Sequence, residues 1–377
     1  MARKETNFKQ TDIGLIPHDW EVEEIIDIAS ISTGGQNTQD AKDGGLYPFY
    51  VRSPKVERIN SYLYDTEGVV TAGDGVGVGK VFHYVNGKFG LHQRCYLIHR
   101  FKGVWAKYFY MYFSLQFYNR VMSMTAKSSV DSVRRDMIAH MLIPLPPIEE
   151  QKRIAEVLSH FDEHIDNLAA LLEKRKQVKA ATMHALLSGT TRLPGFTAPW
   201  GKRTIEQISN RYDNLRIPVA ENLRVKGCTP YYGANGIQGY VQGYTHDGEF
   251  VLIAEDGASD LSNYPTQYVI GKIWVNNHAH VLQGKSGQCS NCFLCYALKT
   301  PKYKEIVVGG ERAKLNAKNL MEIELFIPTI LKEQEAIADI LSNMDRGIEA
   351  LEEQIEKYRQ MKEGAMEELL TGKVRLI

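Results

Sequence analysis

The chain has 377 residues, of which 44% are hydrophobic, and its 45 basic side chains equal its 45 acidic ones. This length exceeds one ordinary core and predicts two globular domains. No apolar run approaches about 18 residues and the first residues are polar, so the sequence predicts neither a membrane span nor a secretion signal. The five cysteines are then expected to be reduced thiols in a cytoplasm.

Residues 1–145 are expected to form a first mixed α/β domain. Short β-like runs lie at Val69–Ala72, Val81–Tyr84 and Cys95–Ile98, next to glycine-rich turns. An aromatic-rich helix is predicted over Trp105–Met122.

The glycine run Gly73–Lys80 invites a phosphate-loop interpretation. Asp74 stands where a nucleotide loop needs its first glycine, and Val81 where it needs serine or threonine. A β-like run follows, whereas a dinucleotide fingerprint would open a long helix. The favoured interpretation is a tight turn that allows close approach of the backbone.

Residues 146–190 predict a long helix with a coiled-coil seam. Pro146 and Pro147 stop any helix before it, and Gly189 supplies the left-handed residue that ends it. About 38 helical residues would extend roughly 57 Å. The apolar positions follow steps of four and three, as in a coiled coil, at Ile154, Leu158, Phe161, Ile165, Leu168 and Leu172.

Residues 191–328 predict a second mixed domain that repeats the first faintly. β-like runs lie at Val251–Ala254 and Val269–Val275, and a helix is expected over Cys292–Tyr303. Cys289, Cys292 and Cys295 have metal-ligand spacing, but the first domain has no counterpart. Small buried residues on a helix are therefore the favoured interpretation, and no metal site is predicted.

Residues 329–377 predict a second long helix that repeats the first. At an offset of 183 residues, 18 of 43 positions in 151–193 and 334–376 are identical. Its seam is Ile337, Leu341, Met344, Ile348, Leu351, Ile355 and Tyr358. An antiparallel pair is expected, because a parallel pair would force the middle segment to reach back the whole helix length. Because the end of the second helix matches the lead into the second domain, the repeat is expected to be cyclic, with a pseudo-two-fold relation.

Loops of both domains carry Arg, Lys, Gln and Asn, which read base edges in DNA, and Lys and Ser, which hold phosphates. For a single residue a solvated surface is the commoner explanation, but these sets recur at matching places. The candidates in the first domain are Tyr50, Arg52, Lys55, Arg58, Lys80, Lys88, His92, Gln93, Arg94, Lys127 and Ser128. Those in the second are Tyr232, Asn235, Gln238, Lys272, Asn276, Asn277, His278, Arg312 and Lys314. No methyl-transfer, hydrolase or paired-carboxylate motif was found, so the chain is expected to be non-catalytic.

The motif at Pro144–Ala155, its second copy at Ile327–Ala338 and the opening Ile13–Trp20 resemble the specificity subunit of type I restriction–modification enzymes. The second copy departs from the first by losing the double proline and one residue. The resemblance implies two target-recognition domains, each reading half of a split site in double-stranded DNA. The helices would be a spacer and a platform for two modification subunits, which carry S-adenosylmethionine, and a restriction subunit can join. The main alternative is a coiled-coil adaptor with peptide-binding domains.

Overall fold

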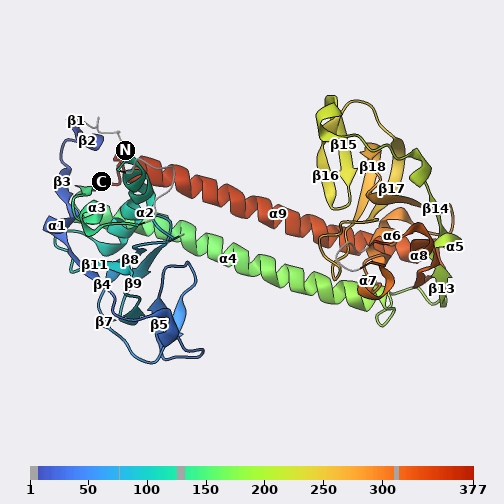
Figure 1. Ribbon diagram of the computed structural model, residues 1–377, viewed down its shortest axis with the longest axis horizontal. Helices are drawn as coiled ribbons and strands as arrows, with labels where there is room; N and C mark the ends of the chain where they lie inside the picture. The colour runs from blue at the N-terminus through green and yellow to red at the C-terminus, as the bar shows by residue number, and fades with distance from the viewer. Residues whose placement is uncertain (1–6, 76, 125–131, 310–313) are drawn as a thin grey trace. The chain divides into compact units, whose positions relative to one another are not determined.

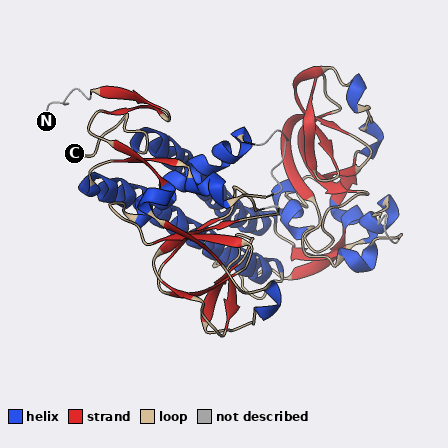
Figure 2. Cartoon of the chain, turned by 60° about the vertical axis from the view of Figure 1, so that its left-hand side comes forward, coloured by secondary structure: helices blue, strands red, loops and turns tan. Residues whose placement is uncertain are grey.

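The computed structural model describes residues 7–75, 77–124, 132–309 and 314–377 (Figure 1). The chain divides into two compact units. Unit 1 consists of Met1–Ala169 with Glu353–Ile377, and unit 2 consists of Ala170–Glu352. Both units mix helices and strands (Figure 2). Each unit contains part of the same two long helices. The predicted mixed class with two domains is confirmed.

The long helices are α4 (Ile148–Leu187) and α9 (Leu331–Leu369), with 40 and 39 residues. Their stop signals are those predicted. The double proline lies just before α4, and Gly189 and Gly372 follow the two helices with φ of +72° and +73°, a conformation that favours glycine. Within the described residues, no helix is long and apolar enough to cross a membrane.

In each unit, a segment of α4 packs against a segment of α9. The contacts between these segments are Asp162–Lys362 and His164–Tyr358 in unit 1, and Lys176–Glu352 and Lys179–Asp345 in unit 2. Residue numbers rise along α4 as they fall along α9, so the paired segments run antiparallel. All thirteen seam positions named above are buried or half-buried.

The described part of unit 1 forms two four-stranded sheets and two smaller strand pairs. The strands are β1 (Phe8–Thr11), β2 (Gly14–Pro17), β3 (Glu21–Glu24), β4 (Ser30–Thr33), β5 (Tyr47–Tyr50), β6 (Glu57–Ile59), β7 (Tyr64–Asp65), β8 (Gly68–Ala72), β9 (Phe82–Val85), β10 (Lys88–Leu91), β11 (Cys95–His99) and β12 (Leu142–Leu145). The sheets have the orders β6-β5-β10-β7 and β4-β11-β8-β9, and β1 pairs with β2 and β3 with β12. The predicted strands β8, β9 and β11 are confirmed within a residue.

Besides its parts of α4 and α9, the described residues of unit 1 form three helices that pack against the second of these sheets or against one another. They are α1 (Ile25–Ile28), α2 (Ala106–Ser123) and α3 (Arg135–Ala139), so the predicted helix after β11 is confirmed. The rings of Phe109, Phe113 and Phe117, one turn apart on α2, stack in series and fill the core against Phe82 of β9.

Where the structure describes it, unit 2 forms one six-stranded sheet and one strand pair. The strands are β13 (Trp200–Thr204), β14 (Ser209–Arg211), β15 (Lys226–Gly233), β16 (Gly236–Val241), β17 (His246–Ala254), β18 (Thr266–Val275), β19 (Ala279–Gly284) and β20 (Glu324–Pro328). The order is β14-β19-β17-β18-β15-β16, and β13 pairs with β20. The helices are α5 (Ile205–Ile208), α6 (Asn291–Ala297), α7 (Tyr303–Ile306) and α8 (Ala317–Glu322).

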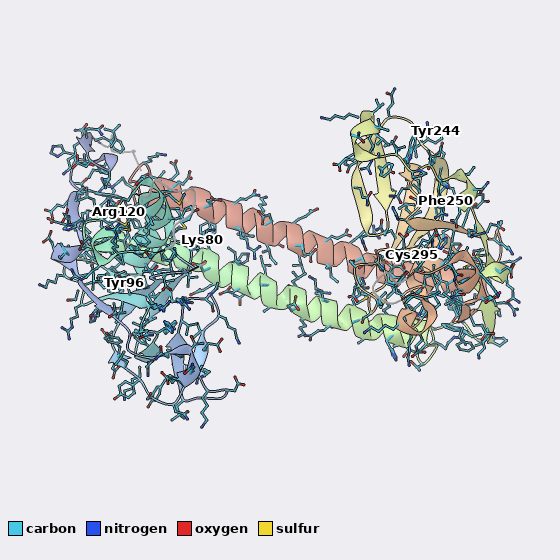
Figure 3. The ribbon with its side chains drawn as sticks, viewed as in Figure 1. Lys80, Tyr96, Arg120, Tyr244, Phe250 and Cys295 are labelled. Carbon is cyan, nitrogen blue, oxygen red and sulfur yellow. The ribbon has the colours of Figure 1, made fainter. Side chains whose placement is uncertain are left out.

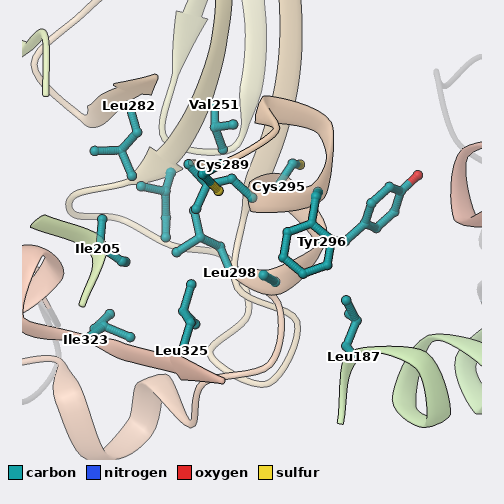
Figure 4. Packing of buried hydrophobic residues seen from close by; sticks show 14 of the residues in the cluster. Leu187, Ile205, Val251, Leu282, Cys289, Cys295, Tyr296, Leu298, Ile323 and Leu325 are labelled. Atoms are coloured by element: carbon teal, nitrogen blue, oxygen red, sulfur yellow. The ribbon is translucent and has the colours of Figure 1, made fainter. Parts of the chain in front are cut away.

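The helix predicted over Cys292–Tyr303 was wrong in its extent. Helix α6 stops at Ala297, and the separate helix α7 begins at Tyr303. Pro301 lies in the gap, where its missing N–H and its ring prevent one continuous helix. The cysteine interpretation is confirmed for Cys295, which is buried on α6, whereas Cys292 on α6 is half-buried and Cys289 is buried just before the helix. Cys289 and Cys295 pack among Val251, Leu282 and other apolar side chains (Figure 4), and burial raises the pKa of each thiol to about 12.

Each unit fixes its long helix to the adjoining domain through a buried glutamate. In unit 1, Glu150 of α4 accepts hydrogen bonds from the Trp20 indole at 3.2 Å and from the Arg375 guanidinium at 2.7 Å. In unit 2, Glu333 of α9 accepts from the Trp200 indole at 3.2 Å and from Arg192 at 2.7 Å. The two glutamates are 3% and 0% exposed, so each carboxylate relies on its arginine for neutralisation.

Candidate nucleic-acid interface

Among the described residues, each unit contains one pair of parallel strands, and the two pairs have the same local arrangement. In unit 1, β10 runs parallel to β5, and in unit 2, β18 runs parallel to β15. Parallel strands end at the same sheet edge. The His92 amide donates to the Tyr50 carbonyl at 3.0 Å, and the Asn276 amide donates to the Tyr232 carbonyl at 3.1 Å. The candidate residues that follow these strands are therefore brought together.

A third strand brings an aspartate beside these residues, from the other four-stranded sheet in unit 1 and from the same sheet in unit 2. After β8, the Gly73 amide donates to the Arg94 carbonyl at 2.8 Å, and after β17 the Glu255 amide donates to the His278 carbonyl at 2.9 Å. The next residue in each case is an aspartate. We call Arg52, Asp74, His92, Gln93 and Arg94 the first strand-end cluster, and Asp256, Asn276, Asn277, His278 and Lys314 the second strand-end cluster.

In the first strand-end cluster, one carboxylate holds two guanidinium groups. Asp74 accepts from Arg52 at 2.6 Å and from Arg94 at 3.0 Å. Burial acts to raise the pKa of Asp74, but the hydrogen bonds and charges of the two arginines outweigh it and lower this pKa. The Arg94 side chain is still 59% exposed, and it lines a pocket of about 260 Å³ together with Gln93 and Tyr96. The remaining donors of Arg94 face solvent, where a base edge or phosphate could accept them.

The second strand-end cluster uses a histidine in place of the second arginine. The His278 Nδ1 lies 2.5 Å from an Asp256 carboxylate oxygen, and the His278 amide donates to the Asn276 side chain at 2.8 Å. Asn276 is almost fully buried, whereas Asn277 is exposed. The second cluster therefore presents an amide and an imidazole where the first presents an amide and a guanidinium.

Behind the second strand-end cluster lies a buried network of charges. Within the described residues, Asp213, Glu255 and His280 form the one group close enough to hold a metal ion. The His280 Nε2 lies 2.8 Å from the Leu315 carbonyl and Nδ1 lies 2.6 Å from an Asp213 oxygen. Both ring nitrogens of His280 thus lie against protein oxygens, and neither is directed at an open position for a metal. Arg216 and Lys314 pair with Glu255 at 2.7 and 2.8 Å, so the geometry is that of an ion-pair network.

This network predicts a loss of stability in acid. Burial acts to raise the pKa of both Asp213 and Glu255. The hydrogen bond and charge of His280, with the Val281 amide and the charge of Arg216, outweigh it and lower the pKa of Asp213. Hydrogen bonds from Lys314 and Arg216, with the charges of His280 and Arg216, lower the pKa of Glu255. A folded-state pKa below the unfolded value, about 4, contributes stability above that pH and loses it as the pH falls through the folded value. Asp213→Asn should therefore flatten the decline in unfolding free energy between pH 5 and 3, relative to Asp247→Asn at an exposed site. Equal declines in the two variants would contradict this.

Other candidates lie away from the clusters or serve the fold. Arg58 donates to the Gly45 and Leu46 carbonyls, and Lys55 is an exposed side chain near Glu57. The half-buried Tyr50 ring packs against the rings of His83 and Phe89.

The remaining candidates divide in the same way. Lys80 lies over the Tyr118 ring. The Asn235 side chain donates to the Gly257 carbonyl at 2.8 Å. Gln238 accepts a hydrogen bond from Asn276 of the second strand-end cluster. Tyr232 is half-buried at the end of β15. Lys88 and Lys272 lie three residues before the ends of β10 and β18. Lys127, Ser128 and Arg312 lie outside the described residues.

Two residues of the clusters were not among the sequence candidates. Asp74 and Asp256 orient the basic side chains, and the signal that could have identified them is the Asp-Gly pair that both domains share. The glycine run after Asp74 is confirmed as a place of close backbone approach. A Cβ on Gly77 would lie 2.3 Å from the Arg52 carbonyl oxygen, and Gly79 has φ of +66°.

The family model for the type I restriction modification DNA specificity domain matches residues 17–177 and again 198–358. A Haemophilus influenzae protein named as a type I restriction enzyme specificity subunit is 45% identical over 145 residues, which cover 38% of this chain and only 37% of that protein. The Methanocaldococcus jannaschii type I restriction enzyme MjaVIII specificity subunit is 25% identical over 99% of this chain and 97% of that protein.

Solved structures show the same fold. The crystal structure of a type I restriction–modification system S subunit from M. genitalium has a TM-score of 0.69 at 18% identity, covering 93% of this chain and 96% of that one. A chain from a structure titled as the basis of complex assembly and conformational transition of the type I system has a TM-score of 0.56 at 14% identity, covering 95% and 99%. Since the two family matches together span well over half of the sequence, this chain belongs to the family of type I restriction–modification DNA specificity proteins.

Proposed function

We propose that this chain is the DNA-recognition subunit of a type I restriction–modification complex, and that each domain reads one half of a bipartite site. The recognition domains would be residues 1–145 and 191–328. The observation that carries the proposal is the recurrence of the strand-end cluster. Both domains place an aspartate, an exposed amide and a basic side chain beside one parallel strand pair, and these side chains suit base edges in a groove.

The long helices, residues 146–190 and 329–377, would form an antiparallel coiled coil that sets the spacing between the half-sites. The thirteen shielded seam positions and the antiparallel contacts in each unit support this role. The matched glutamate–arginine pairs support a cyclic, pseudo-two-fold repeat. Arg375, near the end of the chain, binds Glu150 in unit 1 as Arg192 binds Glu333 in unit 2. Such a repeat would offer two equivalent docking sites for two modification subunits.

The chemistry would belong to the partners. We propose that this chain is non-catalytic and acts in the cytoplasm, and that modification subunits with S-adenosylmethionine methylate adenine at the site it selects. A restriction subunit would complete a nuclease. Purified alone, the chain should show no methyl transfer, DNA cleavage or nucleotide hydrolysis.

Substitutions in the two clusters should alter the two half-sites separately. Arg94→Ala removes the exposed guanidinium of the first strand-end cluster, and a lost base contact costs about 1–3 kcal/mol of discrimination. We therefore expect relaxed methylation at one half-site only, while Asn277→Ala relaxes the other. The measurement is mapping of methylated adenines in cells that express the chain with its modification subunits.

Exposed side chains outside the clusters provide the control. Arg100→Ala, beyond the far end of β11, should leave both half-sites unchanged. Equal changes at both halves from either cluster variant would contradict the two-reader proposal. A peptide-binding adaptor would leave DNA methylation unaffected by any of these substitutions.

A further inference from the structure

A lysine lies over an exposed tyrosine ring at the same place in both domains. The Lys88 ammonium is 4.9 Å from the centre of the Tyr62 ring, and the Lys272 ammonium is 4.7 Å from that of Tyr244. The two tyrosines are 46% and 50% exposed. Both come from the segment just before the strand that pairs with the lysine's own strand, and Figure 3 labels Tyr244 in unit 2. Neither tyrosine was among the candidates predicted from the sequence.

The lysines are held over the rings although each has a carboxylate nearby. Lys88 is opposite Asp65 in the β10–β7 pair, and Lys272 is opposite Asp247 in the β18–β17 pair. Among the residues that the structure describes, neither lysine forms an ion pair, and each ammonium lies over the ring face instead. A cation placed this way is positioned but not neutralised, because the ring supplies a quadrupole and not a charge. Both domains therefore present an exposed, oriented positive charge.

The distance from each lysine to its cluster is also the same. His92 is four positions after Lys88, and Asn276 is four positions after Lys272. At about 3.3 Å per strand residue, this is roughly 13 Å. The major groove of DNA is about 12 Å wide. When a strand-end cluster faces the base edges, the lysine on the same strand lies near the rim of the groove, where the phosphates are.

We propose that Lys88 on Tyr62 and Lys272 on Tyr244 are matched phosphate contacts, one for each half of the DNA site. This proposal rests on the proposed DNA-recognition function and adds a division of roles within each domain. The strand-end cluster reads bases, and the lysine, held by its tyrosine, fixes the position of the strand on the backbone. A phosphate contact carries no sequence information itself, so both lysines should act equally on all DNA sequences.

Salt dependence of DNA binding tests the proposal directly. The complex of the chain with its modification subunits is titrated with a cognate duplex and with a scrambled duplex over a salt series. Lys88→Ala and Lys272→Ala should each reduce the slope of log K against log salt by about one, and the double variant by about two. Affinity for the two duplexes should fall by the same factor. Tyr62→Phe keeps the ring and should match the unaltered protein, whereas Tyr62→Leu should reduce affinity.

The control is Lys102→Ala, an exposed lysine beyond the far end of β11, which should leave the slope unchanged. If Lys88→Ala and Lys272→Ala behave like this control, the lysines are not phosphate contacts, even where cognate DNA is still preferred. A changed base preference would show that the lysines read bases. A smaller mass of the complex, from loss of a modification subunit, would show that the lysines belong to a protein-docking surface. Either result overturns the proposal. Failure of the unaltered complex to prefer cognate DNA would instead refute the proposed function.

Discussion

Arg375→Ala should destabilise unit 1 severely. The Arg375 side chain is 9% exposed and pairs with Glu150, which is almost fully buried. Removing one partner of a buried ion pair leaves the other charge without compensation and costs about 3–5 kcal/mol. For a unit of this size, each 1 kcal/mol lowers the melting temperature by roughly 2–4 °C. Thermal unfolding followed by circular dichroism should therefore show a transition lowered by about 10 °C.

A neighbouring lysine provides the matched control. Lys373, two residues before Arg375, also forms an ion pair, with Glu368, but the Lys373 side chain is 60% exposed. An exposed pair contributes about 0–1 kcal/mol, so Lys373→Ala should leave the transition almost unchanged. Faster amide hydrogen exchange in Arg375→Ala is expected in β2, β3 and the start of α4. The reason is that Glu150, which accepts the Trp20 hydrogen bond, is no longer held in place by Arg375. Equal melting temperatures for the two variants would show that the anchor does not stabilise unit 1.

The long helices could be predicted closely because their signals are local. The seam repeats every three to four residues, and prolines and glycines mark three of the four ends, so the helix bounds follow from neighbouring residues alone. The strands β8, β11, β17 and β18 were identified for the same reason, as compact apolar runs. The division of α6 from α7 also has a local signal, in Pro301, which the prediction did not use.

The candidate interface could be predicted only in part, because it is assembled by long-range contacts. Gln93 and Arg94 follow a strand, which a sequence can suggest, but their partner Asp74 comes from another strand that meets them through backbone hydrogen bonds. Arg58 is an arginine in a polar segment just as Arg94 is, yet the Arg58 guanidinium donates its hydrogen bonds to loop carbonyls. The acceptor that each arginine meets is a property of sheet order, and residue type does not reveal it.

The helix pair also allows a test of the proposed spacing. Insertion of one heptad after Leu168 in α4 and one after Ile355 in α9 keeps the apolar seam in phase, because seven residues are two turns of a coiled coil. These positions leave Asp162–Lys362 on one side of the insertion and Lys176–Glu352 and Lys179–Asp345 on the other. Each existing contact therefore retains both of its partners. The control is a four-residue insertion at the same positions, which rotates the seam and should lower stability.

The heptad variant should recognise the same two half-sites with a wider gap between them. Seven helical residues add about 10 Å, and at about 3.4 Å per base pair this is roughly three base pairs. DNA twist would absorb part of the accompanying rotation. Methylated adenines mapped in cells with the variant and its modification subunits should show unchanged half-site bases and a gap longer by about three. A variant that folds, binds its partners and still selects the original gap would show that the helices do not set the spacing. Loss of recognition at one half-site alone would instead indicate damage to a single domain.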